Sequence, residues 1–280
     1  MKKLVKTKIN GFEIYYRADD IFVGQNVARG NYEEYFTRLL SRNIKKGDTV
    51  MDIGANIGYD TLIMASRTGE KGRVLAFEPD PVNFEILRKN VSVNGFKNVL
   101  LINAGLGDKN KESDLYISKS NYGDHQLYDS GDDRERVRVE VRTLDDVIKE
   151  QRIKRVDLIK ADTQGYEPAV FGGGKKTLRR DRPTLFFEYW PKAYETAGFD
   201  KRKMMKLLED IYGGQIFFID EYIQIYYRRK QKTIDEAVGD SSQCNLMAIN
   251  NLSLGDKIGQ FKDFQVKKFA KRGLGVFPLT

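Results

Sequence analysis

The feature that most constrains this chain is an apolar segment that breaks into a glycine turn and then starts a helix. Residues 49–53 form an apolar run typical of a strand, Gly54 and Gly58 follow, and a helical pattern begins at Tyr59. Glycine allows a tight turn and a close approach of a ligand, and the first N–H groups of a helix point at such a ligand. Asp52 lies at the carboxyl end of the strand, where open α/β sheets bind ligands. The segment therefore predicts a cofactor site.

The spacing within the turn indicates which cofactor is bound. Dinucleotide-binding turns read G-x-G-x-x-G, whereas this turn reads D-x-G-x-N-x-G through Asp52, Gly54, Asn56 and Gly58. An acidic side chain inside the turn repels a pyrophosphate and suits an ammonium or sulfonium group. About 20 residues further on, Glu78 ends a second apolar strand, a position from which a carboxylate accepts ribose hydroxyls. Together these features predict S-adenosylmethionine, with its cationic end near Asp52 and its ribose near Glu78.

Further segments occur in a fixed order along the chain: VMDIGANIGYDTLIMA, VLAFEPDPVNFEILRKNV, VLLINAGLGD, VDLIKADTQGYE, PTLFFEY and CNLMAI. In this order they resemble the FkbM-type family of S-adenosylmethionine-dependent methyltransferases. The likeness extends from about Asn10 to Asn250, and its specificity lies in the ordered set, since D-x-G-x-x-x-G alone is common to class I methyltransferases. The resemblance implies methyl transfer to a hydroxyl of a sugar, polyketide or other secondary metabolite. The fold itself does not imply the reaction.

Strand and helix patterns alternate along the chain, which is typical of a doubly wound sheet. The predicted fold class is α/β, with a mostly parallel, seven-stranded Rossmann-like methyltransferase sheet and a small N-terminal hairpin and helix extension. We expect three regions: the extension at 1–43, the methyltransferase domain at 44–250 and a basic aromatic C-terminal tail at 251–280.

Individual elements are predicted from periodicity and turn residues. The hairpin is expected from residues 8–16 and 21–23, and residues 115–118 and 137–142 are expected to be added edge strands. The core strands are predicted at residues 49–53, 74–77, 99–103, 156–161, 184–188, 215–219 and 246–250. A helix is predicted from Pro81 to Asn94, with Pro81 in its first turn and Gly95 after its end.

The third predicted core strand ends in the small residues NAGLGD. In class I methyltransferases the adenine lies against this strand end, so the resemblance implies Asn103, Ala104 and Asp108 as contacts on the adenine side. A glycine turn without a ligand explains the same residues, because such turns are common after strands. Both interpretations are open at this point.

The fourth apolar strand delivers Asp162 to the ligand edge of the sheet, and the segment DTQGYE then turns into a helix. The family's usual form resembles D-x-E-G-x-E, so Asp162, Gly165 and Glu167 match while Gln164 replaces a carboxylate. Hard cations prefer several carboxylate oxygens, and no metal site is therefore predicted. We expect Asp162 to contact the methionine end of the cofactor or the substrate, a role that is compatible with capping the helix.

Glu188 and His125 are further candidates for the chemistry. Glu188 ends the fifth apolar strand at the edge where a substrate must approach, and it is either a substrate-side acceptor or simply solvated. His125 is the single histidine and lies in a polar loop; its ordinary pKa of about 6.5 suits removal of a proton from an attacking hydroxyl. Asp124 is expected to orient it, and an incidental histidine is the alternative. The predicted catalytic residues are His125, Asp162 and Glu188.

Charge and hydropathy limit which partners and which cellular location are expected for this protein. The net charge is +8, yet the core motifs contain no nucleic-acid module, so a nucleic acid is not the expected partner. No stretch approaches the roughly 20 apolar residues that span a bilayer, and the N-terminus lacks an apolar signal core. Cys244 is the single cysteine, which fits a reducing compartment. A cytoplasmic protein is therefore predicted.

The tail at 251–280 interleaves phenylalanines with lysines and predicts a short basic amphipathic helix before Gly273. Three roles are open: peripheral contact with an anionic membrane that presents carrier-linked acceptors, packing on a neighbouring subunit, or docking of the aromatic side chains on the protein's own sheet. The sequence leaves the oligomeric state open.

Two other functions are open from the sequence alone. A nicotinamide-dependent oxidoreductase is disfavoured by the missing middle glycine and by Asp52. A cofactor-binding interaction protein without catalytic activity is favoured by Gln164, which departs from the family's usual form. The preferred function is S-adenosylmethionine-dependent O-methylation of a small-molecule, glycan or carrier-linked acceptor.

Overall fold

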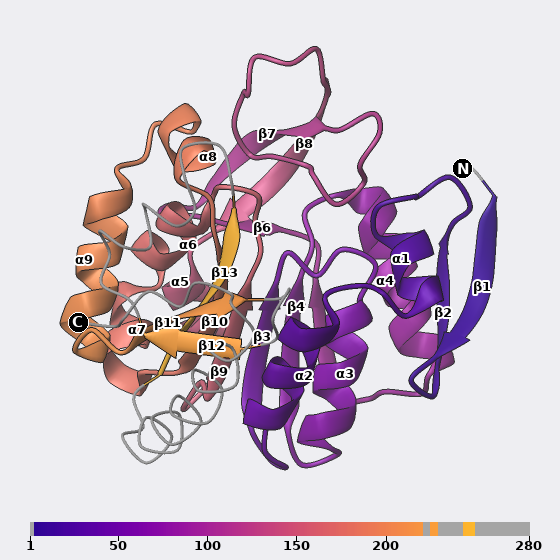
Figure 1. Cartoon of the computed structure of the whole chain (residues 1–280), viewed down its shortest axis with the longest axis horizontal. Helices are drawn as coiled ribbons and strands as arrows, with labels where there is room; N and C mark the ends of the chain where they lie inside the picture. Colours follow the sequence, from indigo (N-terminus) through magenta and orange to yellow (C-terminus); the bar gives the residue numbers. More distant parts are fainter. Residues whose placement is uncertain (1–2, 221–224, 229–242, 250–280) are drawn as a thin grey trace, which may run out of the picture.

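The structure is a computed structural model that describes residues 3–220, 225–228 and 243–249. Its centre is a mostly parallel sheet, with smaller β-structures beside it (Figure 1). The sheet has eight strands in the order β12-β11-β13-β10-β9-β3-β4-β5. Their bounds are β3 Thr49–Ile53, β4 Arg73–Phe77, β5 Val99–Ile102, β9 Leu158–Ala161, β10 Thr184–Tyr189, β11 Ile216–Asp220, β12 Ile225–Arg228 and β13 Cys244–Ala248.

The predicted α/β class and the mostly parallel sheet are confirmed. Strands β5, β4, β3, β9 and β10 run parallel to one another, and β13 pairs antiparallel with both β10 and β11. The chain winds from β3 outward to β4 and β5 and then returns to β9 on the other side of β3, so the direction of winding changes between β3 and β9. The eighth strand, β12, is not among the seven expected.

Helices connect and cover the strands. Asp80 accepts a hydrogen bond from the Asn83 N–H at 2.9 Å, and Pro81 takes the first helical position, so the fourth helix begins where the sequence predicts. The bounds are α1 Gly24–Arg29, α2 Glu34–Asn43, α3 Tyr59–Thr68, α4 Pro81–Val93, α5 Leu144–Glu150, α6 Glu167–Gly173, α7 Lys175–Asp181, α8 Pro191–Thr196 and α9 Lys201–Tyr212.

Helices pack on both faces of the sheet, because its strands are apolar on both sides (Figure 1). Successive side chains of a strand point to opposite faces. Phe187 accordingly packs with Leu144 and Phe171 in one core cluster, on the face covered by α5 and α6, whereas Phe186 packs with Phe36 of α2 and Met64 of α3 in another. The ends of the strands are thereby held in fixed positions for the site.

The N-terminal hairpin corrects one prediction. Strands β1 (Leu4–Ile9) and β2 (Phe12–Arg17) pair across the two-residue turn of Asn10 and Gly11, both with positive φ, which is a favoured hairpin geometry. The expected hairpin from residues 8–16 and 21–23 is therefore wrong, because the Asn-Gly turn falls inside the first of these segments. The correct signal was present in the sequence as an Asn-Gly pair between apolar runs.

The two predicted edge strands do not join the main sheet. Strands β7 (Lys111–Ile117) and β8 (Glu135–Arg142) form a separate sheet with β6 (Gly105–Leu106), in the order β6-β8-β7. The Asn103 side chain donates to the backbone oxygens of Glu78 and Pro79 at 2.8 and 3.2 Å, just after β5 ends. The chain therefore leaves the main sheet at this point, and the small sheet projects beyond the strand ends (Figure 1).

No helix among the described residues is long and apolar enough to cross a membrane. The predicted amphipathic helix at 251–280 lies outside the described residues. The division into regions 1–43, 44–250 and 251–280 stays a prediction.

The junction between β3 and β9 leaves no space for a side chain at Gly54. The Asp162 N–H donates to the Ile53 oxygen at 3.0 Å, which brings the two chain segments together just beyond their strands. Gly54 has a φ of 78°, and a Cβ atom there would lie 1.8 Å from the Asp162 backbone oxygen. The glycine is therefore required by the neighbouring chain segment, in addition to any ligand.

A buried lysine joins the same two strands to helix α3. Lys160 Nζ lies 3.2 Å from Asp52 Oδ1 and 3.6 Å from Asp60 Oδ2, and it donates to the Gly54 oxygen at 3.1 Å. Burial lowers the pKa of Lys160, but Asp52 and Asp60 outweigh this effect and raise it above its usual value. The lysine therefore stays charged and compensates two buried carboxylates.

We expect Gly54→Ala to lower the free energy of unfolding by at least about 2 kcal/mol, because the new Cβ strains a left-handed backbone and overlaps the Asp162 oxygen. Gly95→Ala is the matched control: Gly95 has a φ of 71° and nothing within 4 Å of a Cβ position. Gly95→Ala should lower the free energy of unfolding only by the cost of the backbone strain, about 1 kcal/mol. Urea denaturation of both variants measures the difference, and equal losses would contradict the role assigned to the Asp162 contact.

We expect Lys160→Met to lower the free energy of unfolding by about 3–5 kcal/mol, because Asp52 and Asp60 lose their counter-charge while staying buried. Lys97→Met removes an exposed lysine and should change stability by no more than about 0.5 kcal/mol. Both values come from urea denaturation at pH 7. A loss of under about 1 kcal/mol for Lys160→Met would show that the ion cluster does not hold the junction together.

Candidate active site

A cavity of about 260 Å³ opens at the carboxyl ends of β3, β4 and β9. The turn after β3 contributes residues 54–57, the end of β4 contributes 77–79, and the segment after β9 contributes 162–164. Residues 104–106 and the loop between β7 and β8 form further walls. The cavity lies where the direction of winding changes, which is where open α/β sheets bind ligands.

The structure revises the role predicted for Asp52. Its carboxylate is fully buried beneath the turn, accepts a hydrogen bond from Thr61 Oγ1 at 2.6 Å and pairs with Lys160. It does not line the cavity. Sequence reasoning missed Lys160, although a lysine inside an apolar strand signals a buried counter-charge. The carboxylates that do line the cavity are Glu33, Asp60, Glu78, Asp162 and Glu188.

The backbone N–H groups of the glycine turn are bonded within the protein rather than free. Those of Gly54 and Ala55 donate to the Phe77 oxygen, and that of Asn56 donates to Glu78 Oε2 at 2.8 Å. Gly58 does not line the cavity; a Cβ there would meet Leu87 Cδ1 of α4 at 2.5 Å. The turn therefore shapes the cavity through its backbone path.

Glu78 lines the cavity, and its predicted role as a ribose acceptor stays a prediction. Its Oε1 accepts from the Asp80 N–H at 2.9 Å and its Oε2 from the Asn56 N–H at 2.8 Å. Burial raises the pKa of Glu78 to about 8, an effect that these two hydrogen bonds and Lys160 only partly oppose. Each carboxylate oxygen has a second lone pair with which it can accept a further hydrogen bond.

The structure separates the three residues predicted on the adenine side. Ala104 is buried and lines the cavity, together with Pro79, Leu106 and Leu127. Asn103 and Asp108 are exposed and do not line it. The Asn103 side chain caps the turn after β4, and the Asp108 Cβ faces Gly172 of α6. Of the three, only Ala104 therefore contributes to an apolar wall of the cavity.

The geometry also revises the prediction that His125 is the base. The ring lines the cavity, but its Nδ1 atom accepts a hydrogen bond from the Ser118 N–H at 3.1 Å. The proton of the neutral ring is then on Nε2, which lies 3.7 Å from Asp80 Oδ2. Burial lowers the pKa of His125. Asp124 does not orient the ring but binds Arg134 at 2.9 Å, so His125 has no free lone pair for a substrate.

A latch that the sequence did not predict, formed by Tyr122, Asn56 and Asn83, ties the loop between β7 and β8 to the glycine turn at residues 54–58. This turn is called the cofactor turn below, after its predicted role. The Tyr122 backbone oxygen accepts hydrogen bonds from Asn56 Nδ2 and Asn83 Nδ2, both at 3.0 Å. Asn56 adopts a φ of 49°, which asparagine tolerates better than most residues. An asparagine at the turn and another in the first turn of α4 were the available signals. The loop thereby closes one side of the cavity.

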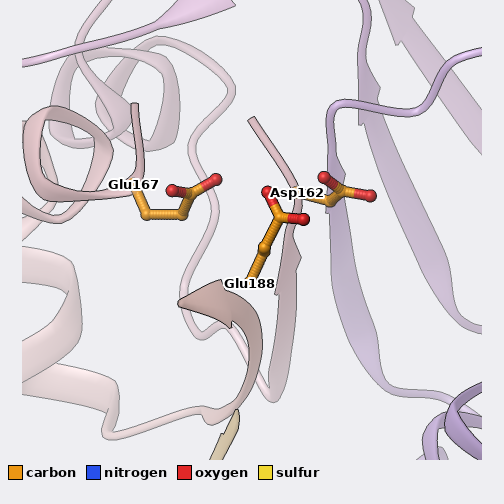
Figure 2. A group of neighbouring side chains, drawn as sticks. All are labelled: Asp162, Glu167 and Glu188. Carbon is orange, nitrogen blue, oxygen red and sulfur yellow. The ribbon is translucent and has the colours of Figure 1, made fainter. Parts of the chain in front are cut away.

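Asp162, Glu167 and Glu188 come together at the other side (Figure 2). Asp162 follows β9, Glu167 begins α6 and Glu188 lies in β10; one carboxylate oxygen from each lies within 4.8 Å of the others. Gln164 Nε2 donates to Asp162 Oδ1 at 2.7 Å and to Glu188 Oε2 at 3.3 Å. The predicted substrate-side residues Asp162 and Glu188 are therefore neighbours, and Glu167 joins them.

Two of these carboxylates, Glu167 and Glu188, have raised pKa values. Burial raises the pKa of Glu188 well above its usual value, and the charges of Asp162 and Glu167 add to the effect. Burial also raises the pKa of Glu167 to about 7, although Thr163 donates to its Oε1 from both N–H and Oγ1, at 2.6 and 2.8 Å. Such groups bind protons or cations more readily than exposed carboxylates do.

The protein-family comparison matches the methyltransferase FkbM domain to residues 52–213, more than half of the chain. 2-O-methyltransferase NoeI from Sinorhizobium fredii is 29% identical over 180 residues, which cover 59% of this chain and 72% of that protein. Hexuronic acid methyltransferase AglP from Haloferax volcanii is 24% identical over 181 residues, which cover 64% of this chain and 68% of that protein.

Among solved structures, methyltransferase FkbM from Methylobacillus flagellatus aligns with a TM-score of 0.45 and 15% identity. The alignment covers 80% of this chain and 60% of that one. Since the family model covers more than half of the sequence, including the cofactor turn and the carboxylate cluster, this chain belongs to the FkbM methyltransferase domain family and is a methyltransferase.

Proposed function

We propose that the protein transfers the methyl group of S-adenosylmethionine to a hydroxyl oxygen of a sugar, glycan or other secondary metabolite. The observation that carries this proposal is a single cavity with two chemically different ends. Glu78, beyond β4, marks one end, and Glu188, in β10, marks the other. Three strand spacings of about 4.8 Å separate β4 from β10, so a cofactor and an acceptor can be held side by side.

The residues at the first end fit the cofactor. Glu78 is placed to accept hydrogen bonds from ribose hydroxyls, and Ala104, Leu106 and Leu127 offer an apolar wall to the adenine. The cavity lining contains more carboxylates than basic groups, which favours a ligand with ammonium and sulfonium charges. When bound, S-adenosylmethionine supplies a methyl group activated by its positively charged sulfur.

The residues at the second end fit the acceptor. Asp162 and Glu188 line the cavity where they can receive the proton of an acceptor hydroxyl, and burial raises the pKa of Glu188, which increases its affinity for that proton. The hydroxyl oxygen forms a bond to the methyl carbon while the carbon–sulfur bond breaks and its electron pair stays on sulfur. Much of the acceleration comes from holding these atoms in line.

The names of the relatives support a sugar hydroxyl as the acceptor. One relative is named a 2-O-methyltransferase and another a hexuronic acid methyltransferase. A third, sdnD from Sordaria araneosa, is named a methyltransferase and is 29% identical over 174 residues. The proposal is tested by incubating the protein with labelled S-adenosylmethionine and a panel of sugars, glycans and polyketides. Absence of label transfer to every hydroxyl compound, combined with transfer to an amine, would overturn it.

We expect the affinity for S-adenosylhomocysteine to fall as the pH drops below about 8, by up to about tenfold per pH unit. Ribose hydroxyls donate to the charged form of Glu78, whose raised pKa of about 8 means that it carries a proton at lower pH. Calorimetry between pH 6 and 9 measures the effect. Glu78→Gln should bind more weakly and lose this dependence; a variant that binds like the unaltered protein would remove Glu78 from the cofactor site.

We expect Asp162→Asn and Glu188→Gln to lower kcat by about 10²–10⁴-fold, because each removes a proton acceptor. His125→Gln is the matched control, since a glutamine supplies both an acceptor for the Ser118 N–H and a donor toward Asp80. It should keep kcat within about tenfold of the unaltered protein. Steady-state rates with a labelled methyl group decide the matter, and an equally large loss in His125→Gln would restore histidine as the base.

A further inference from the structure

The cluster of Asp162, Glu167 and Glu188 has no positive partner in the described part of the chain. None of the ion pairs among the described residues involves any of the three. Lys160 lines the same cavity, but its ammonium is already paired with Asp52 and Asp60. Carboxylates that lie this close together, two of them buried, are stabilised by a proton or a cation.

We propose that Asp162, Glu167 and Glu188 bind one divalent cation with a preference for oxygen ligands, such as Mg²⁺ or Mn²⁺. The ligand oxygens lie within 4.8 Å of one another (Figure 2). Ligands on opposite sides of an ion are separated by twice the metal–oxygen distance, which is about 4.2 Å for Mg²⁺ and about 4.8 Å for Ca²⁺. The cluster therefore already has nearly the spacing of a coordination sphere.

A second observation points to a ligand. Glu167 is fully buried, and its Oε2 atom has no hydrogen-bond partner among the described residues, although its Oε1 is bonded to Thr163. The Glu167 carboxylate points toward that of Glu188 (Figure 2). A buried carboxylate oxygen without a partner costs free energy, and a cation between the two carboxylates removes that cost.

Gln164 does not exclude the ion. Its Nε2 atom lies between the carboxylates of Asp162 and Glu188 and donates to both. Turning the amide over by rotation of its terminal bond places Oε1 at the same point, where it adds a neutral oxygen ligand. Within the segment at 162–167, Gln164 replaces a carboxylate, whereas the fold adds the carboxylate of Glu188 from β10.

The inference rests on the proposed function and extends it to the acceptor. An ion at the substrate end of the cavity would bind two adjacent hydroxyl oxygens of one acceptor and would lower the pKa of the hydroxyl that is methylated. The proton of that hydroxyl would pass to a carboxylate oxygen of Asp162 or Glu188 that does not hold the ion. The acceptor class is therefore a compound with neighbouring hydroxyls, such as a sugar with a free diol. This arrangement explains why carboxylates from three separate elements meet beside the cavity.

The test is a titration of the full chain, freed of metals with a chelator, with Mn²⁺ followed by electron paramagnetic resonance. We expect one bound ion per chain, with the affinity reduced at least about tenfold in Glu167→Gln and Glu188→Gln. Gln164→Glu adds a carboxylate and should strengthen binding, a gain that misfolding cannot imitate. Glu78→Gln, a buried carboxylate beyond β4, is the control and should bind Mn²⁺ like the unaltered protein.

Mn²⁺ that stays free at millimolar concentration would overturn the inference, and so would one bound ion whose affinity is the same in Glu167→Gln, Glu188→Gln and the unaltered protein. Calorimetry with S-adenosylhomocysteine in the presence of chelator keeps the two proposals apart. Retained cofactor binding without any Mn²⁺ binding removes the metal site and leaves the proposed function standing. Loss of cofactor binding in Glu78→Gln alone, with Mn²⁺ binding unchanged, supports two separate ends of the cavity.

Discussion

The close contact between the backbone after β3 and the backbone after β9 is the constraint on which the rest of the site depends. Gly54 faces the Asp162 oxygen without space for a Cβ, and Lys160 binds Asp52, Asp60 and the Gly54 oxygen beneath the same point. The cofactor turn and the carboxylate cluster begin on adjacent strands. Their separation is therefore set by main-chain packing and a buried ion cluster, both of which resist deformation.

The buried carboxylates at the site fall into two groups, one with a positively charged partner and one without such a partner among the described residues. Asp52 and Asp60 are compensated by a lysine from the protein itself, and loss of that lysine would leave both carboxylates buried without a counter-charge. Glu167 and Glu188 have no such partner among the described residues, and burial disfavours their charged forms. The fold thus accepts a locally unfavourable arrangement beside the cavity, which is typical of groups that act on a ligand rather than on the stability of the chain.

Short sequence patterns predicted most strands of the sheet. The features that they did not predict depend on contacts between segments that are distant in the sequence. Strand β3 and the start of α4 were predictable because apolar runs, Gly54 and Pro81 mark their ends. The hairpin was misplaced because the Asn-Gly turn was overlooked. The role of Asp52 depends on Lys160, and that of His125 depends on Ser118 and Asp80, none of which a local pattern reveals. Glu167 could be recognised as part of the carboxylate cluster only from the fold, which places it beside Glu188.

The latch over the cofactor turn is made by a main-chain atom. Both lone pairs of the Tyr122 oxygen are used, one by Asn56 and one by Asn83, whereas the Tyr122 side chain has separate contacts with Asp19 and with the Arg17 guanidinium. Substitutions at position 122 can therefore change how the loop meets the N-terminal segment without removing the latch. The two asparagines therefore hold this wall of the cavity in place whatever side chain stands at position 122.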